Sequence, residues 1–113
     1  MPAYMIARAT INNRAKFEQE FLPAIKPAFA PHGGKLLAQS DNVVTLIGDD
    51  KIAHLAIAEF PSLAAAQACA TSREFKAAMA IAGTIMTDHY IRMVDGLATP
   101  VEAAAGNSQK ELA

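Results

Sequence analysis

The sequence predicts an α+β fold of the ferredoxin-like type, with the element order βαββαβ and an antiparallel sheet. Two observations support this prediction: short stretches of alternating apolar and polar residues indicate strands, and longer stretches with apolar residues every three to four positions indicate helices between them. The 113 residues suffice for one domain, and 52% of them are hydrophobic, which permits a packed core. We expect that domain over residues 1–97, followed by a flexible or partner-packing tail over 98–113.

The first strand is expected at residues 3–10, where successive side chains alternate between two faces. Asn12 or Asn13 can cap the helix that follows. That helix has an apolar stripe with a four-residue spacing, formed by Phe17, Phe21, Ile25 and Phe29. Pro23 and Pro27 each remove a backbone donor, so we expect them to kink or interrupt this helix.

The second half of the chain repeats the alternation of strands and helices. Either Gly33 or Gly34 is expected to end the first helix with a positive φ. Further strands are predicted at 35–40, 42–48, 52–60 and 88–96, the first two as a hairpin. Ser62 and Ser72 are expected to cap two helices, the second with an inner stripe of Phe75, Met79 and Ala82. In the ferredoxin-like order, the first strand lies between strands 52–60 and 88–96.

Composition excludes several function classes. A net charge of −1 and the absence of Trp argue against nucleic-acid binding, which favours a basic face and stacking aromatics. The stretch AAMAIAGTIM is about half the length of a membrane span, which needs roughly 20 residues. The residues MPAYMIARAT lack the charged start and long apolar core of a signal peptide. The single Cys69 permits no internal disulfide and is expected to be buried and inert. We therefore expect a soluble, cytoplasmic protein that contacts neither nucleic acid nor membrane.

Metal and nucleotide sites also find no support in the sequence. The three histidines are scattered and have no metal-binding spacing: His32, His54 and His89. His54 and His89 are expected on the helix-covered face of the sheet, near strand starts. The glycine pair at 33–34 lacks the remainder of a phosphate-binding loop. We predict no metal and no cofactor.

The two faces of the sheet differ in character. Small residues dominate the face expected under the helices, and we expect them to permit close packing: Met5, Ala7, Ala9, Ala56 and Ala58. The opposite face is bare in a monomer. Two such sheets can cover each other, so we predict a homodimer.

Glu59 raises the main functional question, because it ends an otherwise apolar strand face. Strand parity groups it with four more polar residues on the bare face: Tyr4, Arg8, Tyr90 and Arg92. Apolar neighbours wall this group: Ile6, Leu55, Ile57 and Val94. One interpretation is a ligand site, with Glu59 as proton acceptor, Arg8 and Arg92 as charge stabilisers, and a tyrosine as donor. The other is a structural ion pair between Glu59 and one of these arginines across the strands.

Five stretches together resemble the domain-of-unknown-function-1330 family over about residues 2–97: PAYMIARATI, PHGGKLLAQ, AIAEFPSLAAAQA, TSREFKAAM and MVDG. The resemblance implies a ferredoxin-like fold of the dimeric α/β-barrel superfamily and a homodimer. Superfamily relatives include cofactor-free monooxygenases, small-lactone isomerases, haem-handling enzymes and stress-response barrels. The family pattern carries over at eleven positions: Tyr4, Gly33, Gly34, Glu59, Phe60, Pro61, Ser62, Ser72, Glu74, Phe75 and Gly96.

The chain departs from the family pattern where members commonly have Trp, Pro and Arg, at Cys69, Arg73 and Ala82 respectively. Loss of that Trp and Arg would enlarge and neutralise a nearby pocket, and Arg73 could replace the lost charge in substrate binding. We therefore expect a homodimer that binds a small anionic or carbonyl compound, with Tyr4, Ile6, Ile57, Tyr90 and Arg73 as binding residues.

Whether the protein is an enzyme remains open at this point. Proton-transfer chemistry without a cofactor, such as isomerisation, elimination or ring opening, would use Glu59, Arg8 and Arg92. The alternatives are a non-catalytic binding or stress-associated module, whose cavity is filled by its own side chains, and a cofactor-free monooxygenase.

Overall fold

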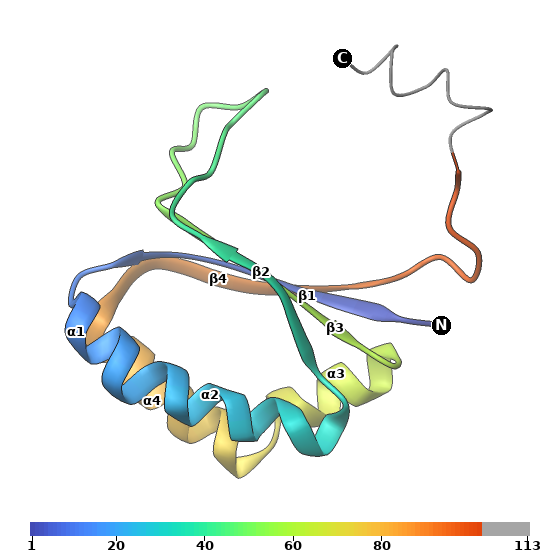
Figure 1. Cartoon of the computed structure of the whole chain (residues 1–113), viewed down its shortest axis with the longest axis horizontal. Coiled ribbons are helices and arrows are strands. Elements are labelled where there is room, and N and C mark those ends of the chain that lie inside the picture. Colours follow the sequence, from blue (N-terminus) through green and yellow to red (C-terminus); the bar gives the residue numbers. More distant parts are fainter. Residues whose placement is uncertain (103–113) are drawn as a thin grey trace.

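The computed structural model describes residues 1–102 and confirms the ferredoxin-like α+β fold. Its elements are β1 (Ala3–Ile11), α1 (Arg14–Lys16), the π-helical η1 (Phe17–Phe21), α2 (Leu22–Phe29), the 3-10 helix η2 (Ala30–His32), β2 (Lys35–Ser40), β3 (His54–Phe60), α3 (Leu63–Ala70), α4 (Arg73–Ile85) and β4 (Met86–Asp95). The described residues form one four-stranded antiparallel sheet in the order β2-β3-β1-β4. All helices lie on one side of this sheet (Figure 1), which leaves the other face open.

The helical segment after β1 begins as predicted and changes its geometry before the first proline. The side chain of Asn13 accepts a hydrogen bond from the Lys16 amide at 3.0 Å, which caps the helix. A π-helical turn at Phe17–Phe21 precedes α2, and Pro23 falls in the first turn of α2, where an amide hydrogen is dispensable. Pro27 lies inside α2 without ending it. The segment therefore changes helix type but is not interrupted.

The remaining helix ends follow the sequence closely. Gly33 has a φ of 71° and ends the helical segment in the left-handed conformation. The hydroxyl of Ser62 accepts a hydrogen bond from the Ala65 amide at 3.0 Å, and that of Ser72 accepts one from the Phe75 amide at 3.2 Å. Both predicted serine caps are thus confirmed.

The predicted strand at 42–48 is wrong. Residues 41–53 form a loop without strand structure, and β3 begins at His54 rather than at residue 52. Three apolar side chains of this loop are almost fully exposed: Val44, Leu46 and Ile47, at 84%, 91% and 91%. Their strand propensity is not realised because a strand needs a hydrogen-bonding partner, and β2 pairs with β3 instead.

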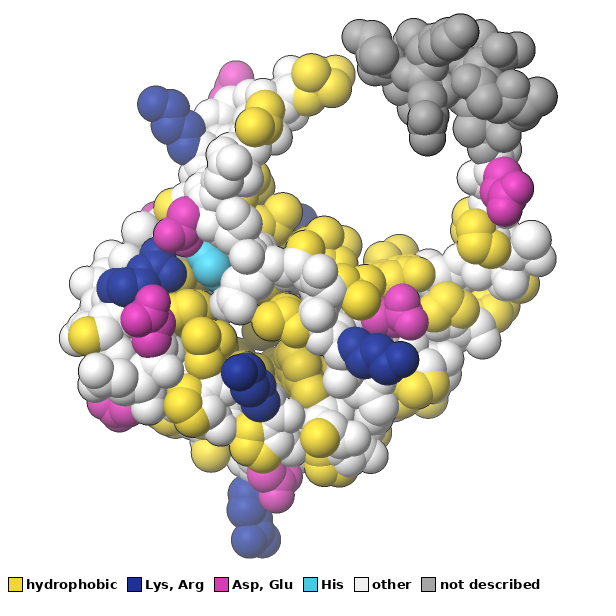
Figure 2. Space-filling view, viewed as in Figure 1, with side chains coloured by type: hydrophobic (Ala, Val, Ile, Leu, Met, Phe, Trp, Pro, Cys, Tyr) yellow, Lys and Arg dark blue, Asp and Glu magenta, His cyan; other side chains and the backbone are white. Residues whose placement is uncertain are grey.

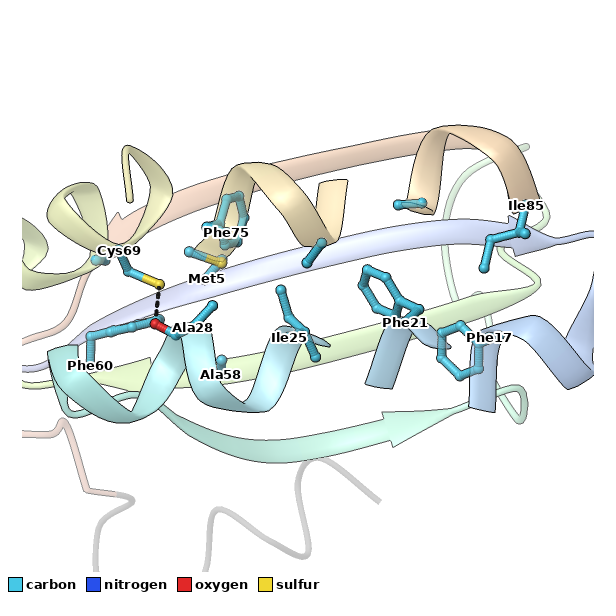
Figure 3. Packing of buried hydrophobic residues seen from close by; sticks show 13 residues of the cluster. Met5, Phe17, Phe21, Ile25, Ala28, Ala58, Phe60, Cys69, Phe75 and Ile85 are labelled. Carbon is cyan, nitrogen blue, oxygen red and sulfur yellow. Dashed lines mark hydrogen bonds between the residues drawn. The ribbon is translucent and has the colours of Figure 1, made fainter. Parts of the chain in front are cut away.

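The core lies between the sheet and the helices (Figure 3). The phenylalanine stripe of the first helical segment is buried at Phe17 and Phe21 and half-buried at Phe29. Cys69 is fully buried, as predicted, and its thiol donates a hydrogen bond to the Ala28 carbonyl oxygen at 3.3 Å. Burial raises the pKa of the Cys69 thiol to about 11, so the thiol is protonated at neutral pH.

Strand pairing confirms the predicted division of the sheet residues into two faces. Tyr4 lies opposite Glu59 on β3 and opposite Val94 on β4, and Arg8 lies opposite Tyr90. A β-bulge interrupts the pairing of β1 with β4 only beyond Arg8, where Asp88 adopts a φ of 50°. The bulge lies outside the paired segment that contains the predicted site. The assignment of residues to faces by strand alternation is therefore correct in that segment.

Two segments extend beyond the sheet on its open side. The loop 41–53 and the residues that follow β4 both project away from the helices and flank the open face (Figure 1). The tail predicted over 98–113 falls mostly on residues 103–113, which lie outside the described residues. Within residues 1–102, no helix has the length and apolar character needed to cross a membrane.

Candidate functional site

An apolar cavity of about 310 Å³ lies between the sheet and the helices. Its sheet side includes three alanines, Ala7, Ala9 and Ala56, together with larger residues such as Met5, Leu36 and Ile91. Side chains of α2 and α4 form the opposite wall: Leu22, Ile25, Phe29, Phe75, Met79 and Ala82. Figure 2 shows a hollow among hydrophobic side chains on one side of the molecule. The expectation that the alanines permit close helix packing is wrong here, because they leave a space that the helix side chains do not fill.

Few polar groups reach this cavity. Lys26, Gln39 and His89 line it, and part of Arg8 contributes to its wall. Lys26 and His89 are exposed, which puts them where the cavity meets solvent, whereas Gln39 is half-buried. Among the described residues that line the cavity, none is acidic. The charged side chains among the described lining residues are therefore basic: Arg8 and Lys26.

The five polar residues predicted to converge share the open face, and of these only Arg8 also contributes to the cavity wall. Arg8 donates from Nη1 to Asp50 Oδ2 at 3.2 Å and from Nε to the Asp88 carbonyl oxygen at 3.1 Å. The Arg8 and Arg92 guanidinium carbons lie 5.2 and 4.1 Å from the centre of the Tyr90 ring. Both arginines thus stack on one tyrosine.

Glu59 is half-buried at the end of this face, opposite Tyr4 on β1 and Lys35 on β2. Within residues 1–102 it forms no ion pair with Arg8 or Arg92, so a single chain does not contain the structural pair that the sequence left open. The catalytic roles of Glu59 and the two arginines stay predictions.

The predicted binding residues also fall outside the cavity wall. Ile6 and Ile57 are directly paired on the open face, between the rows that contain Tyr4 and Arg8. Arg73 is the exposed first residue of α4 and does not line the cavity. The sequence thus grouped the open-face residues correctly, while this cavity lies on the other face. Ile57 and Leu55 instead line a second, more open hollow of about 270 Å³ beside β2.

Sequence reasoning missed a polar cluster at the end of β2 and the start of β3. His54 is 7% exposed, and its Nδ1 lies 2.6 Å from Asp41 Oδ1. Its Nε2 lies 3.2 Å from the amide nitrogen of Gln39, and Arg14 donates to Asp41 Oδ2 at 2.7 Å. The hydrogen bonds from His54 and Arg14 lower the pKa of the Asp41 carboxyl. The one available signal was the expected burial of His54, since the partners are 13 and 15 residues away in sequence and form no motif.

The described residues contain no candidate metal site. Between residues 1 and 102, no group of three His, Cys, Asp or Glu side chains gathers in a geometry that could hold a metal ion.

The sheet order, the helices on one face and the apolar cavity between them define a ferredoxin-like α+β domain with a cavity of ligand size. The chain belongs to the family described as domain of unknown function DUF1330, whose model matches residues 2–97. No protein in the curated set matches the chain.

Several solved structures share this fold. The RPA0582 protein of unknown function from Rhodopseudomonas palustris superposes with a TM-score of 0.69 at 22% identity, over 87% of this chain and 84% of its own. SnoaB, a cofactor-independent oxygenase from Streptomyces nogalater, has a TM-score of 0.61 at 17% identity, over 89% and 98%. A dimeric ferredoxin-like protein of unknown function from Thermobifida fusca has a TM-score of 0.58 at 18% identity, over 85% and 92%. At these identities the similarity establishes the fold alone.

Proposed function

We propose that this protein binds a small, largely apolar compound with an anionic or carbonyl group in the cavity between sheet and helices. The observation that carries this proposal is the cavity itself, which has an apolar wall and a volume of about 310 Å³, within the range of small-molecule sites. Lys26 lines the cavity and is exposed, so its ammonium group can meet the polar end of the ligand at the entrance. The described lining residues include no acidic group that would repel an anionic ligand, which supports the same proposal.

We also propose that the protein is a homodimer joined through the open face of its sheet. The solved neighbour from Thermobifida fusca is described as dimeric and shares the fold. Four apolar residues lie on the open face beside the polar ones: Ile6, Leu55, Ile57 and Val94. The loop 41–53 and the residues after β4 flank this face and could contact a second copy (Figure 1).

Any reaction of the bound compound would be cofactor-independent in this proposal. Proton-transfer chemistry, such as isomerisation, elimination or ring opening, needs only a positioned acid or base and a stabilised charge. The fold similarity to SnoaB supports cofactor-free oxygenation as a second candidate. A binding module without catalysis is the third, and it differs from both because it leaves its ligand unchanged.

Filling the cavity from the sheet side should abolish binding. We expect 2-naphthoate, an apolar ring system with one carboxylate, to raise the Tm of the wild-type protein by several degrees when it is well above Kd. The Ala56→Leu side chain would occupy the ligand's space and lower the affinity by roughly tenfold or more. Isothermal titration calorimetry measures the affinity, and circular dichroism verifies the fold.

The matched control is Ala80→Leu, which adds the same side chain at an exposed position of α4 that does not line the cavity. It should bind 2-naphthoate as the wild type does. Equal affinities of Ala56→Leu and the wild type, or no binding of 2-naphthoate, benzoate or acetophenone to the wild type, would contradict the cavity proposal.

The Glu59→Gln variant tests whether the ligand binds in the cavity or on the open face of the sheet. Because Glu59 does not line the cavity, we expect Glu59→Gln to keep the Tm rise caused by 2-naphthoate. If Glu59 instead binds the ligand or accepts a proton on the open face, Glu59→Gln loses that rise while Ala56→Leu keeps it. Thermal shift measurements on both variants distinguish these results, and the second pattern would assign the ligand to the open face.

A further inference from the structure

Gln39 belongs both to the cavity wall and to the polar cluster around His54. It is a half-buried polar residue of the cavity wall, and its amide contacts the buried ring of His54. We propose that Gln39 accepts a hydrogen bond from a hydroxyl group of the ligand, and that Asp41 and His54 hold its amide in the orientation needed for this. The inference deepens the proposed function and rests on it, since it assigns a hydroxyl-bearing class of compound, a phenol, enol or alcohol, to the same cavity.

The first step concerns the proton on His54 Nδ1. Asp41 Oδ1 lies 2.6 Å from Nδ1, and Asp41 Oδ2 accepts from Arg14 at 2.7 Å. An ionised carboxylate can only accept hydrogen bonds, so Nδ1 must be the donor in this contact. Arg14 also lies with its guanidinium carbon 5.4 Å from the centre of the Phe17 ring, which helps to hold it beside Asp41. The charge and position of Asp41 therefore keep a proton on Nδ1.

The second step concerns Nε2, the other ring nitrogen. It faces the amide nitrogen of Gln39 at 3.2 Å. An amide nitrogen donates and does not accept, so Nε2 is the acceptor in this contact. The ring has little freedom to turn, because it is 7% exposed and packs edge-on against Phe17 at 5.4 Å between centres. The proton on Nδ1 thus determines which end of the Gln39 amide faces His54.

The third step concerns the carbonyl oxygen of Gln39. With its amide nitrogen turned to His54, the oxygen is the end of the amide left for another partner, and none of the described residues donates to it. Gln39 is one of the residues that line the apolar cavity, and its carbonyl oxygen, without a donor, would lose hydrogen-bonding free energy when a ligand displaces water from it. A ligand hydroxyl would restore that hydrogen bond, whereas a methyl ether of the same ring would not.

The test compares 6-hydroxy-2-naphthoate with 6-methoxy-2-naphthoate, and uses 2-naphthoate as the probe of the cavity alone. For the wild type, we expect calorimetry to give a Kd for the hydroxy compound that is roughly two- to tenfold lower than for the methoxy compound, as one net hydrogen bond predicts. In Gln39→Met, which has no polar group at this position, the ratio of the two Kd values should fall by that factor.

A positioning role of Asp41 makes a separate prediction. Asp41 does not line the cavity, and its side chain is 56% exposed, so Asp41→Ala should fold. Without the carboxylate, the proton can move to Nε2 and the Gln39 amide can turn, so the preference for the hydroxy compound should decrease while 2-naphthoate binds as before. Asp49→Ala, an exposed carboxylate of the same loop, is the matched control and should leave the ratio unchanged.

The outcomes separate this inference from the proposed function. No binding of 2-naphthoate to the wild type contradicts both. Normal binding of 2-naphthoate with the same ratio of Kd values in the wild type and Gln39→Met overturns the role of Gln39 and leaves the cavity proposal intact. A ratio that falls in Gln39→Met but not in Asp41→Ala overturns the positioning role of Asp41 and His54.

Discussion

Replacing Ile57 by aspartate is expected to convert a homodimer into monomers. Ile57 lies near the middle of the open face, opposite Ile6 on β1 and Ala38 on β2, and is half-buried even in one chain. A second sheet packed on this face would remove Ile57 from water completely. An aspartate there would bury a carboxylate in each subunit without a partner, which costs several kcal/mol per site.

The expected magnitude is an increase of the dimer dissociation constant by roughly a hundredfold or more, since each 1.4 kcal/mol corresponds to a factor of ten. Sedimentation velocity over a range of protein concentrations measures this change. The control is Ala77→Asp, which introduces the same charge at an exposed position of α4 on the helical side and should leave the dimer intact. A monomeric wild-type protein, or an unchanged dissociation constant in Ile57→Asp, would show that the open face is not the dimer interface.

The Phe60→Ala substitution should have the largest effect on stability, lowering the free energy of unfolding by about 3–5 kcal/mol. Phe60 is 1% exposed and packs edge-on against Phe29, with ring centres 5.4 Å apart. Gly34 approaches so closely that a Cβ atom there would lie 2.6 Å from the Phe60 ring. Backbone and ring therefore fit each other, and the surroundings cannot collapse easily into the space that a truncated side chain would leave.

Urea denaturation followed by circular dichroism measures this loss, with the slope of the transition compared to verify two-state behaviour. Leu37→Ala is a suitable control, because Leu37 is on β2 and 53% exposed, and we expect a change within about 0.5 kcal/mol. A loss below about 1.5 kcal/mol in Phe60→Ala would mean that the space beneath α2 relaxes around the missing ring, contrary to the close fit at Gly34.

Local sequence patterns were sufficient to predict most of the fold. The four-residue spacing of Phe17, Phe21 and Ile25 identifies a helix with one buried side, because side chains four apart lie on the same face. Serines 62 and 72 start helices because their hydroxyls satisfy amide groups that the first turn leaves free. The alternation of the strands also determined which residues share the open face, since successive strand side chains point to opposite faces.

Tertiary structure decided the features that depend on neighbours distant in sequence. Residues 42–48 have the composition of a strand and form a loop, since strand structure requires a partner that the local sequence cannot specify. His54 obtains its partners Gln39 and Asp41 only because the chain returns antiparallel beside β2.

The cavity is the clearest case of this kind. The small size of Ala7 and Ala56 is visible in the sequence, but small residues permit either close helix packing or an empty space. Whether the helices pack closely or leave a cavity depends on how far the side chains of α2 and α4 reach toward the sheet. That reach depends on how the helices pack together and cannot be predicted from one segment alone. The sequence by itself thus determined the fold and the faces of the sheet, and the packing of the helices over the alanines decided where a ligand can enter.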